Sequence, residues 1–287
     1  MARQDIFEIL NNKYNIEKEF RKVNDLLKIP FIQYYNYQTP APYNMTLEQT
    51  INQKLLLYWK QRKSYFSCEE MKADIDFQEE NFTIENILKA LEYYANLIYL
   101  VQLKTNTQFN TNYQFHTEYY YLIQNIDILL EHLSYQKYFI PNEEKVILIP
   151  NKPEVNTVAE ISTKETALAI LKYNHLSLKG DLDEKRKLLY QIALEYEPLL
   201  KTPIENYKDF FKKTNELLNT LHIRHNNITK ENNKNNVINL ATEELENLYD
   251  ELYQLLLFCI LIKDNTDRKN RVANFLQKIK EANAENE

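Results

Sequence analysis

The fold of this chain is indicated most clearly by residues 207–221, YKDFFKKTNELLNTL. Within this stretch, apolar and small side chains recur at intervals of three and four residues. They are Tyr207, Phe210, Phe211, Thr214, Leu217, Leu218 and Leu221. Because an α-helix has about 3.6 residues per turn, this spacing gathers them into one stripe. The stretch therefore predicts an amphipathic helix over about residues 205–225 with one buried face.

Two neighbouring segments repeat the pattern. The apolar positions are Leu182, Leu189, Ile192, Ala193, Tyr196, Leu199 and Leu200 in residues 181–201, and Leu245, Leu248, Tyr249, Leu252, Leu255, Leu256, Cys259 and Ile260 in residues 242–263. The second half of segment 242–263 is apolar around most of its circumference, which is typical of a central helix. Together with a helix at about 163–177, these segments predict a C-terminal four-helix bundle.

Helix starts can be recognised from their capping side chains. Thr46, Ser162 and Asp181 are each followed three residues later by Glu or Gln, which is the pattern of a capping box. Thr83 and Thr242 are further candidate N-caps. With these starts, helices are predicted at about 4–28, 46–72, 83–104 and 114–136 in the N-terminal half, and at about 266–283 after the bundle. The predicted fold class is therefore all-α.

One segment departs from helical periodicity. Residues 138–140 and 145–150 are short β-prone runs on either side of the polar turn Pro141-Asn142-Glu143-Glu144. They predict a small β-hairpin that lies against helices, because an isolated hairpin is marginally stable in water. The predicted organisation is an N-terminal helical region at 1–137, a hairpin and connecting segment at 138–160, and the bundle at 161–287, with the domain boundary near residue 160.

The composition excludes several classes of function. The chain of 287 residues has a single glycine, Gly180. Phosphate-binding loops and dinucleotide-binding motifs need several glycines, so P-loop and Rossmann nucleotide chemistry are excluded. The net charge is −6, with acids and bases mixed along the chain. No global positive field therefore attracts DNA or an anionic membrane, and any contact with nucleic acid is expected to be local.

The cysteines and histidines indicate neither a disulfide framework nor a metal site. Cys68 and Cys259 lie in unrelated contexts, and His116, His132 and His175 have no ligand-like neighbours in the sequence. We therefore expect no metal and no cofactor. The N-terminus has no apolar signal core, and the longest apolar run, 255–262, is too short to cross a bilayer. A cytoplasmic location is the resulting expectation.

The most informative polar residues follow the predicted helix 205–225. Continuing its buried stripe leads to Arg224 and His225, where a buried cation needs an anionic partner or a solvent-filled seam. Asn226 and Asn227 come next, followed by a polar stretch that contains Lys230. This zone is locally basic within an acidic protein.

The layout of the C-terminal half resembles HEPN domains, which are bacterial helical bundles of toxin–antitoxin, abortive-infection and CRISPR-associated proteins. The resemblance covers about residues 163–263 and is carried by the segments 178–182, 218–227 and 245–250. Active HEPN domains have an Arg followed by a polar residue and, four to six residues later, a His. The resemblance implies a homodimer that cleaves RNA without a metal, with two such pairs at a shared seam.

Carried over by position, Arg224 matches the family's Arg, and His225 matches the polar residue beside it. The spaced His is absent, because Thr229, Lys230 and Glu231 stand where it is expected. Either His225 serves in a shifted geometry, or the domain has the fold without the activity.

The chemistry of such a site is coherent. A His with a pKa near neutrality can exchange a proton with a ribose hydroxyl or the leaving oxygen, and an Arg can hold the developing phosphate charge. His222 is a second candidate acid or base, and it lies three residues before His225. Asn226, Asn227 and Lys230 are candidates for binding the RNA. An Arg-His pair is also favourable at a helix C-terminus without any function.

Two functions are therefore predicted as alternatives. The first is an endoribonuclease of an anti-phage defence or toxin–antitoxin system, acting as a homodimer with catalytic Arg224 and His225. The second is a non-catalytic helical scaffold or regulatory subunit that binds a partner protein of the same system.

Overall fold

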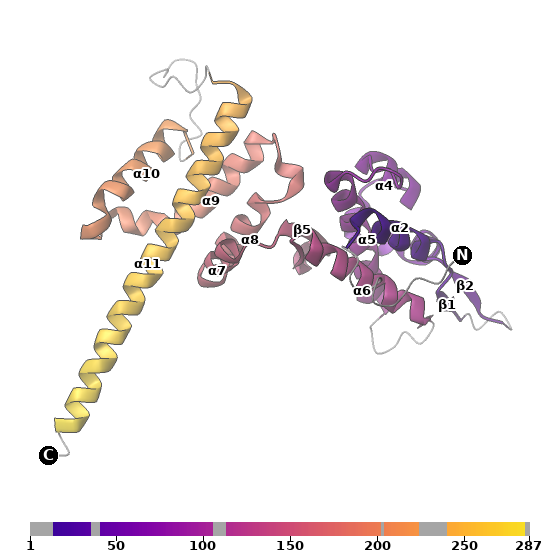
Figure 1. The fold of residues 1–287 in the computed structure, drawn as a ribbon, viewed down its shortest axis with the longest axis horizontal. Helices are drawn as coiled ribbons and strands as arrows, with labels where there is room; N and C mark the ends of the chain where they lie inside the picture. The colour runs from indigo at the N-terminus through magenta and orange to yellow at the C-terminus, as the bar shows by residue number, and fades with distance from the viewer. Residues whose placement is uncertain (1–13, 36–40, 106–112, 202–203, 224–239, 285–287) are drawn as a thin grey trace. The chain divides into compact units, whose positions relative to one another are not determined.

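A computed structural model describes residues 14–35, 41–105, 113–201, 204–223 and 240–284 (Figure 1). The chain divides into two compact units, Met1–Pro150 and Asn151–Glu287. The hairpin segment therefore belongs with the N-terminal helices, whereas the boundary was expected near residue 160.

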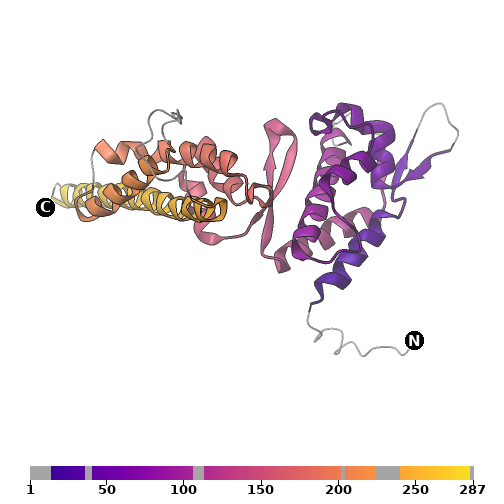
Figure 2. The same cartoon turned by 90° about the horizontal axis from the view of Figure 1, so that it is seen from above.

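The first unit is built around helix α5 (Ile84–Thr105), most of whose side chains are buried. It contacts α6 (Thr117–His132), which in turn packs on α2 (Ile16–Leu27). Its core includes Ile87, Leu91 and Leu97 of α5 and Leu122 of α6, all inaccessible to solvent. In Figure 2 these helices form one cluster, drawn from indigo to magenta, with the smaller strands at its edge.

The single helix predicted at 46–72 is wrong. The segment instead forms a succession of short elements: α3 (Leu47–Thr50), the π-helix η1 (Ile51–Leu55), the 3-10 turns η2 (Leu56–Tyr58) and η3 (Lys60–Arg62), and α4 (Cys68–Ile75). The predicted capping box is confirmed, because Thr46 and Gln49 exchange backbone and side-chain hydrogen bonds. The helix is broken at Trp59, whose extended backbone lets its indole enter the core.

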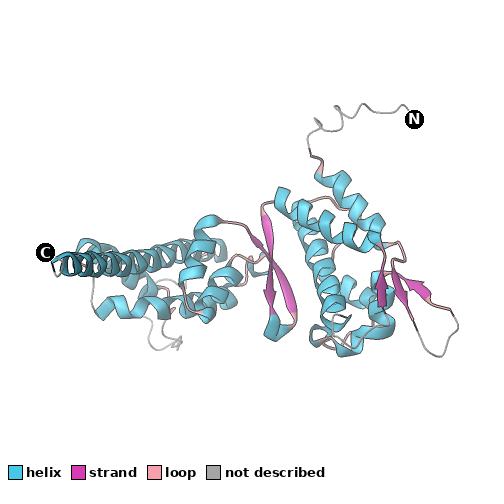
Figure 3. Ribbon diagram, turned by 90° about the horizontal axis from the view of Figure 1, so that it is seen from below, coloured by secondary structure: helices cyan, strands magenta, loops and turns pink. Residues whose placement is uncertain are grey.

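A three-stranded antiparallel sheet was not predicted (Figure 3). Its order is β2 (Tyr43–Met45), β1 (Ile32–Tyr34) and β3 (Tyr113–Phe115). Ile32 pairs with both Met45 and Phe115, and Tyr34 pairs with both Tyr43 and Tyr113. Each strand is only three residues long, so alternation within one strand is too short to be recognised.

The predicted hairpin is confirmed. β4 (Tyr135–Ile140) pairs with β5 (Lys145–Pro150), and the short turn η4 (Pro141–Glu143) joins them. Glu144 closes the turn in the left-handed region, with φ 50°. Residues 146–149 of β5 are buried because this strand lies against α5, as the marginal stability of a free hairpin requires.

The second unit consists of helices. They are α7 (Pro153–Ile161), α8 (Lys164–Tyr173), α9 (Leu182–Lys201), α10 (Lys208–Thr220) and α11 (Thr242–Ala284), with the 3-10 turns η5 (Leu176–Leu178) and η6 (Glu205–Tyr207). Helix α7 was not predicted, and the helices predicted at 242–263 and 266–283 form one continuous helix, α11. Helix α9 packs on α8, α10 and α11, and α10 also packs on α11. Helix α7 packs on α8 and α11.

The directions of these helices follow from contacts near each end. Lys185 of α9 contacts Asp250 of α11, and Glu195 of α9 contacts Lys263, so α9 and α11 run parallel. Helix α10 runs antiparallel to α11, as Figure 1 shows, and Phe210 near its start packs on Phe258, 16 residues into α11. The stripe predicted for α10 is buried at Phe211, Thr214 and Leu218. The described residues are therefore mainly helical, as the sequence indicated, and they contain the predicted hairpin together with one sheet that was not predicted.

Candidate functional site: the polar end of the second unit

Helix α10 ends in a specific hydrogen-bonded turn. Its last helical residue is Thr220, five residues before the predicted end. The N–H of Ile223 donates to the carbonyl of Leu218 at 3.0 Å, and the N–H of His222 donates to the carbonyl of Asn219 at 3.1 Å. His222 has φ 52°. These two bonds around a left-handed residue define a Schellman motif, in which glycine usually occupies the place of His222.

This ending changes the geometry predicted for the site. Leu218, Leu221 and Ile223 are buried, but the left-handed turn at His222 stops the helix before its stripe reaches Arg224. The helix that was predicted to continue to residue 225 therefore ends at Thr220. Of the predicted site residues, His222 alone is described, and it is half-buried. The others, Arg224, His225, Asn226, Asn227 and Lys230, lie outside the described residues.

The helix directions bring four termini to the end of the bundle where α10 finishes. These are the starts of α9 and α11 and the ends of α8 and α10. The polar side chains and backbone groups that meet there, here called the polar end, are Tyr173, Gly180, Lys185, Glu246 and Asp250.

Lys185 is the central group of the polar end. Its side chain is only 8% exposed, and its Nζ lies 2.8 Å from Glu246 Oε1 and 2.7 Å from Asp250 Oδ1. The N–H of Gly180, at 2.9 Å, also donates to Glu246 Oε1. This backbone hydrogen bond and the Lys185 ammonium lower the pKa of Glu246. Burial of one cation is thus offset by two carboxylates.

Aromatic rings connect the polar end to the core. Tyr173 donates its hydroxyl to Asp250 at 2.8 Å and stacks on Tyr253, with ring centroids 4.2 Å apart. The hydroxyl of Tyr253 accepts from Asn174 and donates to the carbonyl of Ile170. Burial raises the pKa of both tyrosines, so at neutral pH they act as hydrogen-bond donors and not as bases.

The polar end can anchor charge, and it leaves one carboxylate accessible. The Asp250 side chain is 52% exposed beside the buried ammonium of Lys185. Sequence reasoning assigned no role to Lys185, Glu246 or Asp250. A signal was present, since Glu246 and Asp250 are four residues apart and therefore share one face of α11. The cation that faces them lies about 60 residues earlier, and its position cannot be derived from local spacing.

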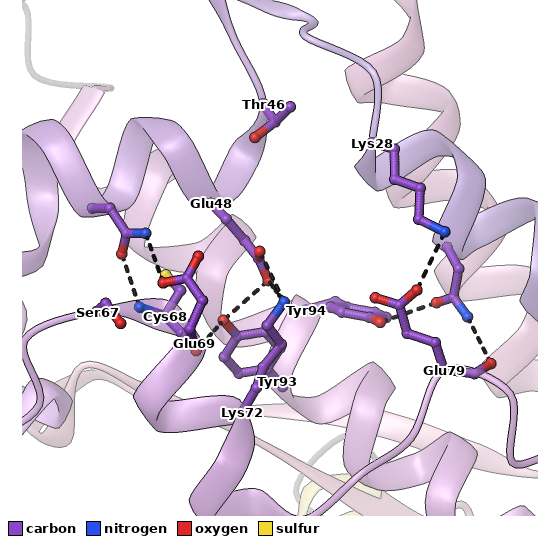
Figure 4. A network of polar contacts seen from close by, with 12 residues as sticks. Lys28, Thr46, Glu48, Ser67, Cys68, Glu69, Lys72, Glu79, Tyr93 and Tyr94 are labelled. Atoms are coloured by element: carbon purple, nitrogen blue, oxygen red, sulfur yellow. Dashed lines mark hydrogen bonds and ion pairs between the residues drawn. The ribbon is translucent and has the colours of Figure 1, made fainter.

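A second polar network lies in the first unit (Figure 4). Lys72 forms an ion pair with Glu48 at 2.9 Å, and Tyr93 donates to Glu48 at 3.3 Å. In the same region, the N–H of Cys68 donates to Asn52, whose amide donates to Glu69. These contacts join α3 and η1 to α4 and α5. Because each of these charges and amides has a partner, we assign the network to stability.

Several kinds of site find no support among the described residues. No group of three or more His, Cys, Asp or Glu side chains in the described ranges can hold a metal ion. No described helix is both long enough and apolar enough to span a membrane. A hollow lined by Ala95, Ile126 and Phe139 offers about 30 Å³, which is the space of roughly one water molecule.

No protein-family model matches the chain, and neither does any curated protein or any solved structure.

Proposed function

We propose that the second unit is a HEPN-like domain that cleaves RNA as a homodimer, without a metal, in a bacterial defence or toxin–antitoxin system in the cytoplasm. In this proposal Arg224 and His225 are catalytic. His222, Asn226, Asn227 and Lys230 bind the RNA. Arg224 holds the charge that develops on the phosphate, and His225 transfers the proton.

The observation that supports this proposal is the anchoring of Ile223, the residue before Arg224. Ile223 is buried, and its N–H closes the Schellman motif at the polar end of the bundle. A catalytic segment needs such a rigid support, because small displacements of the reacting groups cost large factors in rate.

RNA cleavage tests the proposal directly. Purified protein is incubated with total RNA and with tRNA, and the products are resolved on a denaturing gel. We expect cleavage by the wild type and its loss in an Arg224→Ala/His225→Ala variant. Lys212→Ala is the matched control, because it removes an exposed cation from α10. If the double variant cleaves as the wild type does, or if neither cleaves, the proposal fails.

A second candidate function is a non-catalytic scaffold that binds a partner protein. It is favoured by the closed ion pairs of the polar end, where Lys185 is held by Glu246 and Asp250 and is not directed at a substrate. This candidate predicts that the Arg224→Ala/His225→Ala variant keeps the biological activity of the wild type. An assay of phage resistance or growth inhibition in cells distinguishes it from the first.

A further inference from the structure

Helix α11 continues far beyond the helices that pack on it. Figure 1 shows its C-terminal part leaving the rest of the second unit. All described side chains from Asp267 to Asn283 are exposed. An isolated helix of this length is marginal in water, so a contact along one face is needed to stabilise it.

One face of this part carries an apolar stripe. Val272 is 58% exposed, Phe275 is 64% exposed and Ile279 is 43% exposed. Their spacing of three and four residues continues in both directions along α11. The complete series is Phe258, Leu261, Asn265, Arg268, Val272, Phe275, Ile279 and Ala282, which alternates steps of three and four throughout.

This alternation is a heptad repeat. Phe258, Asn265, Val272 and Ile279 occupy its a positions, and the other four residues occupy its d positions. The series spans 25 residues of sequence, more than three heptads, which is the length at which such a pattern indicates a coiled coil. Leu276, at the adjacent e position, is 52% exposed and widens the stripe. Because Phe258 packs on Phe210 of the same chain, the α11 stripe is defined as the other eight residues.

We propose that the α11 stripe binds the same stripe of a second copy of this chain, in a parallel two-stranded coiled coil. Val272 and Ile279 are β-branched residues at a positions, which favour two parallel strands. Asn265 is a polar residue at an a position, which favours a dimer in fixed register because the two amides can hydrogen-bond to each other. In this register Phe275 also meets its own counterpart.

The charges beside the stripe select the parallel orientation. Asp264 lies at a g position and Lys269 at the following e position, so a parallel pair places each Asp264 beside the partner's Lys269. Within the described part of the chain, Asp264 accepts from Arg268, whereas no ion pair is formed by Lys269. An antiparallel pair that kept Val272, Phe275 and Ile279 in contact would bring the two Lys278 side chains together.

The α11 stripe would be the contact surface of the homodimer in the proposed function. The observations that support this surface come from α11 alone. Dimerisation through the stripe does not require RNA cleavage by the second unit. A protein that dimerises through the α11 stripe and leaves RNA intact would uphold this inference and refute the proposed function.

The mass of the full chain in solution is the first test. Sedimentation equilibrium is expected to give a dimer for the wild type and a dimer dissociation constant at least about 100-fold higher for Val272→Asp/Ile279→Asp. Asn270→Asp/Asn274→Asp is the matched control, because it adds the same charge on the opposite face of α11 and is expected to leave the dimer intact. Far-UV circular dichroism checks that all variants fold. A monomeric wild type, or equal masses for the two double variants, would overturn the proposal.

Cysteine cross-linking tests the orientation. In a parallel coil the two residues at one a position face each other, so Val272→Cys and Ile279→Cys are each expected to form disulfide-linked dimers on mild oxidation. Asn274→Cys on the opposite face is expected to remain monomeric on a non-reducing gel, as is the wild type, whose two thiols are buried. Equal cross-linking at Asn274→Cys, or none at Val272→Cys and Ile279→Cys, would overturn it.

Discussion

The side-chain amide of Asn96 forms two hydrogen bonds with the backbone of Val146. Its Nδ2 donates to the Val146 carbonyl at 2.7 Å, and its Oδ1 accepts from the Val146 N–H at 2.9 Å. One helical turn earlier, Glu92 accepts from the N–H of Leu148 at 2.7 Å. Side chains four residues apart on α5 thus hydrogen-bond to backbone groups two residues apart on β5. The geometry matches because four residues of a helix and two residues of a strand both span about 6 Å. Helix α5 therefore supplies hydrogen-bond partners to backbone groups at the free edge of β5, as a third strand would.

Replacing Asn96 is therefore expected to destabilise the first unit. Asn96→Leu leaves the buried N–H and carbonyl of Val146 without partners, at a cost of about 2–4 kcal/mol. Asn142→Leu, at an exposed asparagine in the η4 turn of the same hairpin, is the control and is expected to change stability little. Urea unfolding followed by tryptophan fluorescence measures the difference, because Trp59 lies in the same unit. Equal midpoints for the two variants would contradict this account of β5.

The pairing of Lys185 makes a prediction for the second unit. Lys185→Met removes the cation that Glu246 and Asp250 share, and we expect a loss of about 3 kcal/mol because two carboxylates lose their partner. Lys187→Met, two residues away and mostly exposed, is expected to leave stability unchanged. Adding Glu246→Gln to Lys185→Met is expected to recover part of the loss. Thermal unfolding of these proteins and of Glu246→Gln alone gives the comparison, and additive effects of the two single substitutions in the double variant would refute the coupling.

The lowered pKa of Glu246 predicts how stability depends on pH. The hydrogen bond from the Gly180 N–H and the Lys185 ammonium favour the carboxylate in the folded state. The stabilisation is complete above the unfolded-state pKa of about 4.3 and is lost as the pH falls through the lower folded-state pKa. Glu246→Gln is expected to be less stable than the wild type near neutrality and to approach it in acid. Unfolding free energies from neutral pH down to about pH 3 measure this, and parallel curves would contradict it.

Two left-handed residues are expected to respond in opposite directions to substitution. His222 has φ 52°, a left-handed conformation that is strained for any residue with a Cβ. His222→Gly is therefore expected to stabilise the second unit by about 1 kcal/mol relative to His222→Ala. Gly180, at φ 81°, has nothing within 4 Å of an added Cβ. Gly180→Ala is therefore expected to cost about 1 kcal/mol through the backbone alone. Thermal melting compares the three, and a His222→Gly protein less stable than His222→Ala would count against the Schellman assignment.

The two cysteines are expected to be unreactive in the folded protein. Cys68 and Cys259 are fully buried, and burial raises the pKa of each thiol to about 12. Because the thiolate is the reactive form, titration with a thiol reagent at neutral pH should detect neither cysteine until denaturant is added. After denaturation both should react, which serves as the control. Rapid reaction of either cysteine in the native protein would show that its thiol is accessible to solvent and not buried.

The sequence by itself determined the helical character, the hairpin and most of the helix starts. These features depend on local rules. Thr46 and Gln49 form their capping box because they are three residues apart, and Phe211, Thr214 and Leu218 are buried because helical spacing places them on one face. The β-hairpin followed from two apolar runs around a four-residue turn, all within 16 residues of sequence.

Only the tertiary structure decided the interruptions and the long-range pairs. Helical periodicity continues through Trp59, and the break there arises because the indole packs in the core and bonds to the Glu144 carbonyl, 85 residues away. Residues 207–221 formed the predicted helix, but its early end at Thr220 depends on the burial of Ile223. Lys185 likewise acquires its role from acids on another helix. Such contacts join residues far apart in sequence, and local spacing carries no information about them.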